Sequence, residues 1–249
     1  MTRMQWMIAL AAAGWLTLAA LPAAHAGYYW EMTEVREGMG IPEGMPANLP
    51  AAVKEQLART EERTVRHYAG DEGYRTEDGE MIVIMDYRTM TVFTIDPAEK
   101  TYFRVDMQNL AQETPMVGEM ARAMKESITI TPGEEVRKIA GYTCRKYTLS
   151  SMMGNGEYWA SKEVEAYPYL KNAAEKMSRA MSGDPAFAQM NLGDLIARIE
   201  GFPVQTKMTF MGATTTVTLK RIEKRDLDKA LFQIPAGYAE ELMPSLEPR

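Results

Sequence analysis

The sequence predicts an α+β protein, mainly antiparallel β, in which helices cover the concave face of a curved half-barrel sheet. Short stretches with a two-residue apolar repeat alternate with turn residues along most of the chain, which is typical of antiparallel strands. Two stretches, near residues 115–126 and 166–200, carry a helical apolar repeat instead. Helices inserted between sequential strands have to pack on one face of their sheet. No repeat or composition break divides residues 27–249, so we expect one domain there.

Residues 1–26 have the three parts of a secretory signal peptide. Arg3 supplies the positive start, an apolar run extends from Met7 to Leu21, and Ala24-His25-Ala26 is a small-residue cleavage site. The alternative, an uncleaved membrane anchor, needs about 20 apolar residues, and this run is shorter and rich in alanine. A lipoprotein signal would place a cysteine after the cleavage point, where Gly27 stands. We therefore expect a soluble periplasmic protein that begins at Gly27 and has no stable membrane anchor.

Composition excludes several classes of function. The chain has a net charge of −6, which becomes −7 without Arg3, and no basic block, so nucleic acid is not an expected partner. The single cysteine, Cys144, rules out an internal disulfide, and only His67 remains as a histidine after cleavage. A nucleophile–base pair would have to come from these two residues. The carboxylates of Asp86, Asp96 and Asp106 sit at strand ends, where turns and solvent explain them. We predict no enzymatic activity and no cofactor.

The first half of the mature chain predicts a meander of antiparallel strands. After a first strand, a Gly/Pro-rich loop at 38–50 leads into a short helix at 50–59. Turn signals at Asp78-Gly79, Tyr87-Arg88 and Asp96-Pro97 then separate short apolar strands. The expected strands are 28–35, 64–68, 74–77, 81–86, 90–95 and 101–105.

The second half combines strands with helices. Thr114-Pro115 opens a helix, a second helix is expected at 169–182, and Asp184-Pro185 starts a helical stretch that ends near residue 200. Gly154-Asn155-Gly156 reads as a hairpin turn. The expected strands are 127–131, 136–139, 142–149, 157–161, 204–211 and 215–222, and the last two show the clearest two-residue alternation.

Methionine is unusually abundant, with 21 in the chain and 18 after the first three are removed with the signal. Methionine side chains are flexible and line adaptable apolar surfaces, although they also fill ordinary cores. A curved sheet covered by helices leaves an apolar space between the layers, which is a natural ligand site. The predicted ligand-binding residues are Met81, Val83, Met85, Trp159, Met177, Met181, Met190, Val204, Met208 and Phe210.

Two other functions stay open. Thioethers suit Cu(I), so a periplasmic Met-rich chain can be a copper-binding protein, although no dense Met-x-x-Met tract is present. The chain can also be a protein-interaction module without a small ligand, docking a partner through a sheet edge or through residues 38–50. The sequence does not indicate the oligomeric state.

Six segments in a particular order resemble a family of bacterial envelope proteins related to the outer-membrane lipoprotein carriers of the LolA and LolB type. The segments are Met81–Asp86, Thr94–Tyr102, Lys138–Tyr147, Glu157–Lys162, Gly201–Val204 and Phe232–Tyr238. The resemblance implies a half-barrel closed by helices, with an apolar cavity for acyl chains, and it assigns no individual residue. It therefore implies a periplasmic binding protein for a hydrophobic ligand, a lipid or the acyl chain of a lipoprotein, in envelope biogenesis or sensing.

Overall fold

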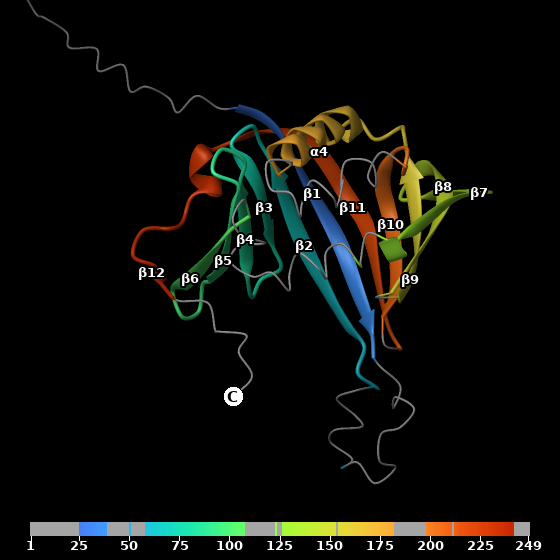
Figure 1. Cartoon of the computed structure of the whole chain (residues 1–249), viewed down its shortest axis with the longest axis horizontal. Coiled ribbons are helices and arrows are strands. Elements are labelled where there is room, and N and C mark those ends of the chain that lie inside the picture. The colour runs from blue at the N-terminus through green and yellow to red at the C-terminus, as the bar shows by residue number, and fades with distance from the viewer. Residues whose placement is uncertain are drawn as a thin grey trace, which may run out of the picture.

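The computed structural model describes residues 25–38, 50, 58–107, 123, 126–152, 154–181, 198–210 and 212–241, with side chains in the 154–181 segment given as far as residue 176. Twelve strands in these ranges form one open, curved sheet in the order β12-β6-β5-β4-β3-β2-β1-β11-β10-β9-β8-β7 (Figure 1). All neighbours are antiparallel except β12 and β6, which run parallel. The prediction of a mainly antiparallel, half-barrel-like sheet is confirmed.

The β2–β6 half of the sheet is the predicted meander. Its strands are β2 (Glu61–Ala69), β3 (Gly73–Glu77), β4 (Ile82–Asp86), β5 (Thr91–Asp96) and β6 (Thr101–Asp106). An aspartate stabilises each of three turns. One of its carboxylate oxygens accepts hydrogen bonds from the backbone N–H groups of the second and third residues that follow it. These aspartates are Asp78, Asp86 and Asp96, and the turn role predicted for the last two is confirmed.

The other half contains β7 (Thr129–Ile139), β8 (Tyr142–Ser151) and β9 (Gly154–Ser161). Two predicted strands merge into β7, whose register shifts between Pro132 and Val136. The predicted turn at residues 154–156 is wrong, because these residues open β9 and pair with residues 149–151. The glycines serve close approach instead: a Cβ on Gly156 would lie 2.2 Å from the sulfur of Met208. The glycine pair is therefore a feature of strand packing and not of a turn.

The two halves meet at β1 (His25–Glu37), which pairs with β2 on one side and with β11 (Ala213–Leu227) on the other. The register between β1 and β11 shifts between Glu31 and Met32. The predicted hairpin at residues 204–222 is confirmed as β10 (Phe202–Phe210) and β11. The N-terminal strand is thus central in the sheet (Figure 1).

One α-helix, α4 (Tyr167–Met181), lies within the described ranges, where the sequence predicts residues 169–182. Leu170 and Ala174 repeat at helical spacing, and Pro168 in the first turn lacks an N–H that the helix would leave unpaired. The predicted helices at 50–59, 114–126 and 184–200 fall mostly outside the described residues, so cover over the concave face is not shown. None of the helices in the described part is long and apolar enough to cross a membrane.

Each face of the sheet carries its own core. The helix-side face, defined by the row Tyr28, Ala69, Tyr74 and Met85 across β1 to β4, packs against α4 through Tyr28 and Tyr169, whose ring centroids are 5.3 Å apart. On the opposite face a smaller cluster forms under the C-terminal 3₁₀ turn, η1 (Lys229–Phe232), with β12 (Ala239–Glu240) following. Its buried members are Ile84, Ile95, Leu227 and Phe232.

Candidate functional site

A pocket of about 440 Å³ lies between α4 and the helix-side face. Pockets that bind small molecules typically measure about 300–1,000 Å³ and are mostly apolar. The sheet side of the wall comes from β1, β3, β4 and the start of β10, and the other side comes from the first half of α4. The lining residues are Trp30, Tyr74, Met85, Tyr87, Tyr167, Leu170, Lys171, Ala173, Ala174, Gly201, Phe202 and Pro203.

Aromatic rings form the sheet side of this pocket. Trp30 is buried, and it stacks on His67 with ring centroids 4.9 Å apart and planes 6° apart. It also meets Tyr74 at 5.8 Å and the edge of Phe202 at 6.0 Å. Such contacts hold rings in defined positions, so this wall is more rigid than a methionine-lined wall.

His67 lies beside Trp30 and Tyr74 on the same face of the sheet and contacts both. Its Nδ1 lies 2.7 Å from the Tyr74 hydroxyl, and its Nε2 is buried without a hydrogen-bond partner among the described residues. Burial lowers the pKa of His67 to about 4, and burial also raises the pKa of Tyr74 well above its usual range. Both side chains are therefore neutral at neutral pH, which suits an apolar site.

The buried imidazole should make the protein acid-sensitive. Between the unfolded pKa of about 6.5 and the folded pKa of about 4, the unfolded chain binds a proton that the folded chain does not, so stability falls as the pH drops. We expect the free energy of unfolding to decrease by about 2 kcal/mol between pH 8 and pH 5. Urea unfolding at both pH values would measure it. His67→Phe keeps a ring beside Trp30 but cannot titrate, so an unchanged pH dependence in this variant would refute the assignment.

The close approach of the chain at Gly201 shapes the end of the pocket. Gly201 has φ +127°, and a Cβ there would lie 2.6 Å from the backbone of Ser161. Only glycine fits this conformation and this contact. Phe202 is the next residue, and its ring contacts the ring of Trp30. The conformation of Gly201 therefore positions the Phe202 ring in the pocket wall.

The structure brings only part of the predicted methionine set to this pocket. Met85 lines it, and Val83 lies two residues earlier on the same face of β4. Met81 precedes β4, and its N–H donates to Asp78 in the turn. Val204 is fully buried in the helix-side core. Met177 and Met181 belong to α4, but their side chains, like all of Met190, lie outside the described residues.

Three predicted residues lie elsewhere. Met208 is on the helix-side face but on β10, five strand spacings from β4 and about 24 Å away along the sheet. Phe210 is at the end of β10, with 45% of its surface exposed. Trp159 pairs with Gln205 and Lys146, and it is buried in the same core cluster as Trp30 and Val204. The Arg137 guanidinium covers its ring at 3.5 Å, and Trp159 is not among the residues that line the pocket.

Sequence reasoning missed most of the pocket's aromatic lining. The missed rings are Trp30, Tyr74, Tyr87, Tyr167 and Phe202. The alternation pattern places Trp30 on a strand but does not show that its ring faces a pocket. The useful signal was Leu170 and Ala174, which stand on the helical stripe of α4 and do line the pocket.

The other candidate chemistry does not assemble. Cys144 on β8 and His67 on β2 are five strand spacings apart, which separates any thiol–imidazole pair. Cys144 is buried, and burial raises the pKa of its thiol. Among the residues that the structure describes, no group of three or more His, Cys, Asp or Glu is placed to hold a metal ion.

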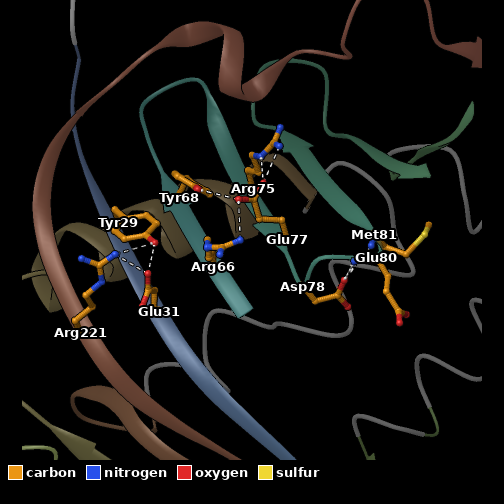
Figure 2. Close-up of polar contacts among 10 residues, drawn as sticks. All are labelled: Tyr29, Glu31, Arg66, Tyr68, Arg75, Glu77, Asp78, Glu80, Met81 and Arg221. Carbon is orange, nitrogen blue, oxygen red and sulfur yellow. Dashed lines mark hydrogen bonds and ion pairs between the residues drawn. The ribbon is translucent and has the colours of Figure 1, made fainter. Parts of the chain in front are cut away.

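The opposite face near β1 carries ion pairs (Figure 2). Glu31 Oε1 accepts hydrogen bonds from Arg221 Nη2 and Tyr29 Oη, both at 2.6 Å. Arg221 and then Tyr29 lower the pKa of Glu31 to about 2. This buried carboxylate is ionised and paired with Arg221 and Tyr29. Its contacts therefore stabilise the fold and do not indicate a catalytic role.

Comparison with known proteins gives weak structural similarities. Two crystal forms of PNGF-II match with 11% identity and a TM-score of 0.39, over 86% of this chain and 31% of that chain. The chain thus spans about a third of the length of these structures. A putative outer membrane lipoprotein-sorting protein domain from Vibrio parahaemolyticus matches with 9% identity and a TM-score of 0.30, over 83% of this chain and 88% of that domain.

The sequence comparisons differ in outcome. The search among curated proteins finds no match. One family model, described as a domain of unknown function (DUF4412), matches residues 41–238. This match extends from the segment after β1 to the residue before β12 and includes every residue of the pocket except Trp30. The chain belongs to the DUF4412 family.

Proposed function

We propose that this protein is a non-enzymatic carrier or sensor of an apolar ligand, a lipid or a lipoprotein acyl chain, and that it works in the bacterial envelope after export. The observation that carries the proposal is the pocket between α4 and the helix-side face. The proposed location rests on the signal-like residues 1–26.

The chemistry of the pocket supports this choice over catalysis. Its wall is built from aromatic and aliphatic side chains, and the histidine beside Trp30 and Tyr74 is held neutral. Burial also raises the pKa of Tyr87 to about 12, so the lining tyrosine stays protonated. An apolar ligand gains about 25 cal/mol for each Å² of surface that such a wall removes from water.

Substitution of one methionine in the pocket should abolish binding. Met85→Asp places a charge in the apolar wall, so we expect at least a tenfold loss of affinity for a fluorescent fatty acid. Met208→Asp is the matched control, because Met208 is also half-buried on the helix-side face but lies five strands away. Native mass spectrometry of protein purified from its own envelope would show whether a lipid is bound.

The outcomes separate the possibilities. Loss of binding in Met85→Asp alone supports the pocket, provided that circular dichroism shows both variants folded. Loss in Met208→Asp alone would place the ligand elsewhere on the same face. No bound lipid and no uptake of fatty acid by the unmodified protein would overturn the proposal.

A further inference from the structure

Lys171 is the one charged residue among the described side chains that line the pocket. It stands on α4 one turn after Tyr167, and about half of its side chain (48%) is exposed. A lysine in this position lays its methylene stem along apolar surface and holds its ammonium group at the water boundary. The pocket therefore has an apolar interior and a positive charge at its edge.

The ammonium group of Lys171 is only loosely engaged within the protein. Its ion-pair partner on the same helix is Glu175, with 4.0 Å between Nζ and Oε1, which is the outer limit for an ion pair. Half-exposed pairs of this kind contribute little, so a ligand anion can compete with Glu175. The first turn of α4 carries no acidic residue, so no carboxylate of that turn offsets the positive end of the helix dipole.

The size of the pocket limits what can enter. A cavity of about 150 Å³ holds one benzene ring, so about 440 Å³ is enough for roughly three such volumes, or one acyl chain. This volume matches one chain better than several chains side by side. The aromatic lining alone would also suit a cationic ligand, but Lys171 would repel one.

We propose that the ligand is a single-chain amphiphile with an anionic headgroup, whose chain lies against Trp30 and Phe202 and whose headgroup pairs with Lys171. This inference rests on the proposed function and adds the headgroup chemistry and the number of chains. A carboxylate and a phosphate monoester share that chemistry, and the experiment distinguishes them.

The mature chain offers a built-in reporter. Trp30 lines the pocket and Trp159 does not, while the other two tryptophans belong to the expected signal. In a Trp159→Phe background, a brominated chain in the pocket should quench the fluorescence of Trp30. The probes are bromododecanoate, its neutral methyl ester and bromododecyl phosphate, each titrated at low salt and neutral pH.

We expect an anionic probe to bind about threefold or more tightly than the methyl ester, which is the range for a partly exposed ion pair. Lys171→Met should remove that preference, so that the anionic probes and the ester bind this variant with equal affinity. Lys176→Met is the matched control, because Lys176 is an exposed lysine of the same helix outside the pocket lining. The preference should also weaken in high salt.

The failures of the two proposals are distinguishable. If the acid, the phosphate and the ester quench Trp30 with equal affinity, the headgroup inference is wrong and the apolar pocket stands. If none of them quenches Trp30, the proposed function itself fails. If Lys176→Met lowers the preference as much as Lys171→Met, a general surface charge explains it and the assignment to Lys171 is overturned.

Discussion

Replacing Trp30 with alanine should cost about 4 kcal/mol of the free energy of unfolding and abolish binding in the pocket. Trp30 is 5% exposed and contacts the rings of His67, Tyr74 and Phe202. Removal of a buried aromatic ring costs about 3–5 kcal/mol, because the surroundings collapse only partly into the space. Urea unfolding followed by far-ultraviolet circular dichroism would measure the loss without using tryptophan fluorescence.

Phe210→Ala is the control for this experiment. It also removes an aromatic ring from a strand, but 45% of Phe210 is exposed and it lies at the end of β10. We expect it to cost less than about 1 kcal/mol. Equal losses in the two variants would mean that Trp30 is not the centre of the helix-side core.

Gly201→Ala should have the second largest effect, a loss of about 3 kcal/mol or more. A side chain at φ +127° is strained by about 1–3 kcal/mol, and the new Cβ would also press on the backbone of Ser161 at 2.6 Å. Since Ser161 belongs to β9, relief of the contact requires movement of a strand. Thermal unfolding and urea unfolding would both report the loss.

Gly212→Ala is the control that separates backbone strain from steric overlap with a neighbouring strand. Gly212 has φ +84°, but no atom lies within 4 Å of the position of its Cβ. The substitution should cost only about 1 kcal/mol, the penalty for placing a side chain in the left-handed region. If Gly201→Ala cost no more than Gly212→Ala, the close approach to Ser161 would not be a real constraint.

The sequence predicted the parts of the sheet whose signals are local. The aspartate-closed turns of the meander and the alternation of residues 204–222 depend on neighbours along the chain, and both agree with the structure. The glycines at 154 and 156 misled because their role is set by Thr209 and Met208 on another strand. A distant contact of this kind leaves no mark in the local sequence.

The pocket was beyond sequence reasoning for a related reason. Its walls come from segments around residues 30, 74–87, 167–174 and 201–203, which only the sheet register and α4 bring together. The face of Trp159 depends on how β9 aligns with β10, and a shift of one residue would move it to the other side. The register also shifts between β1 and β11 and between β9 and β10. Such shifts change the face on which the following side chains lie, and no alternation pattern predicts them.

The central place of β1 has a consequence for the order of folding. β1 precedes the other described strands in the chain, yet its partner β11 ends at Leu227, and their pairing joins residues about 190 positions apart. Contacts so distant in sequence form slowly, because a long loop has to close first. The meander β2–β6 can form early, but the two halves of the sheet are united only when nearly the whole chain has emerged. A chain that stays open until that moment can still pass through a narrow export channel, as the proposed envelope location requires.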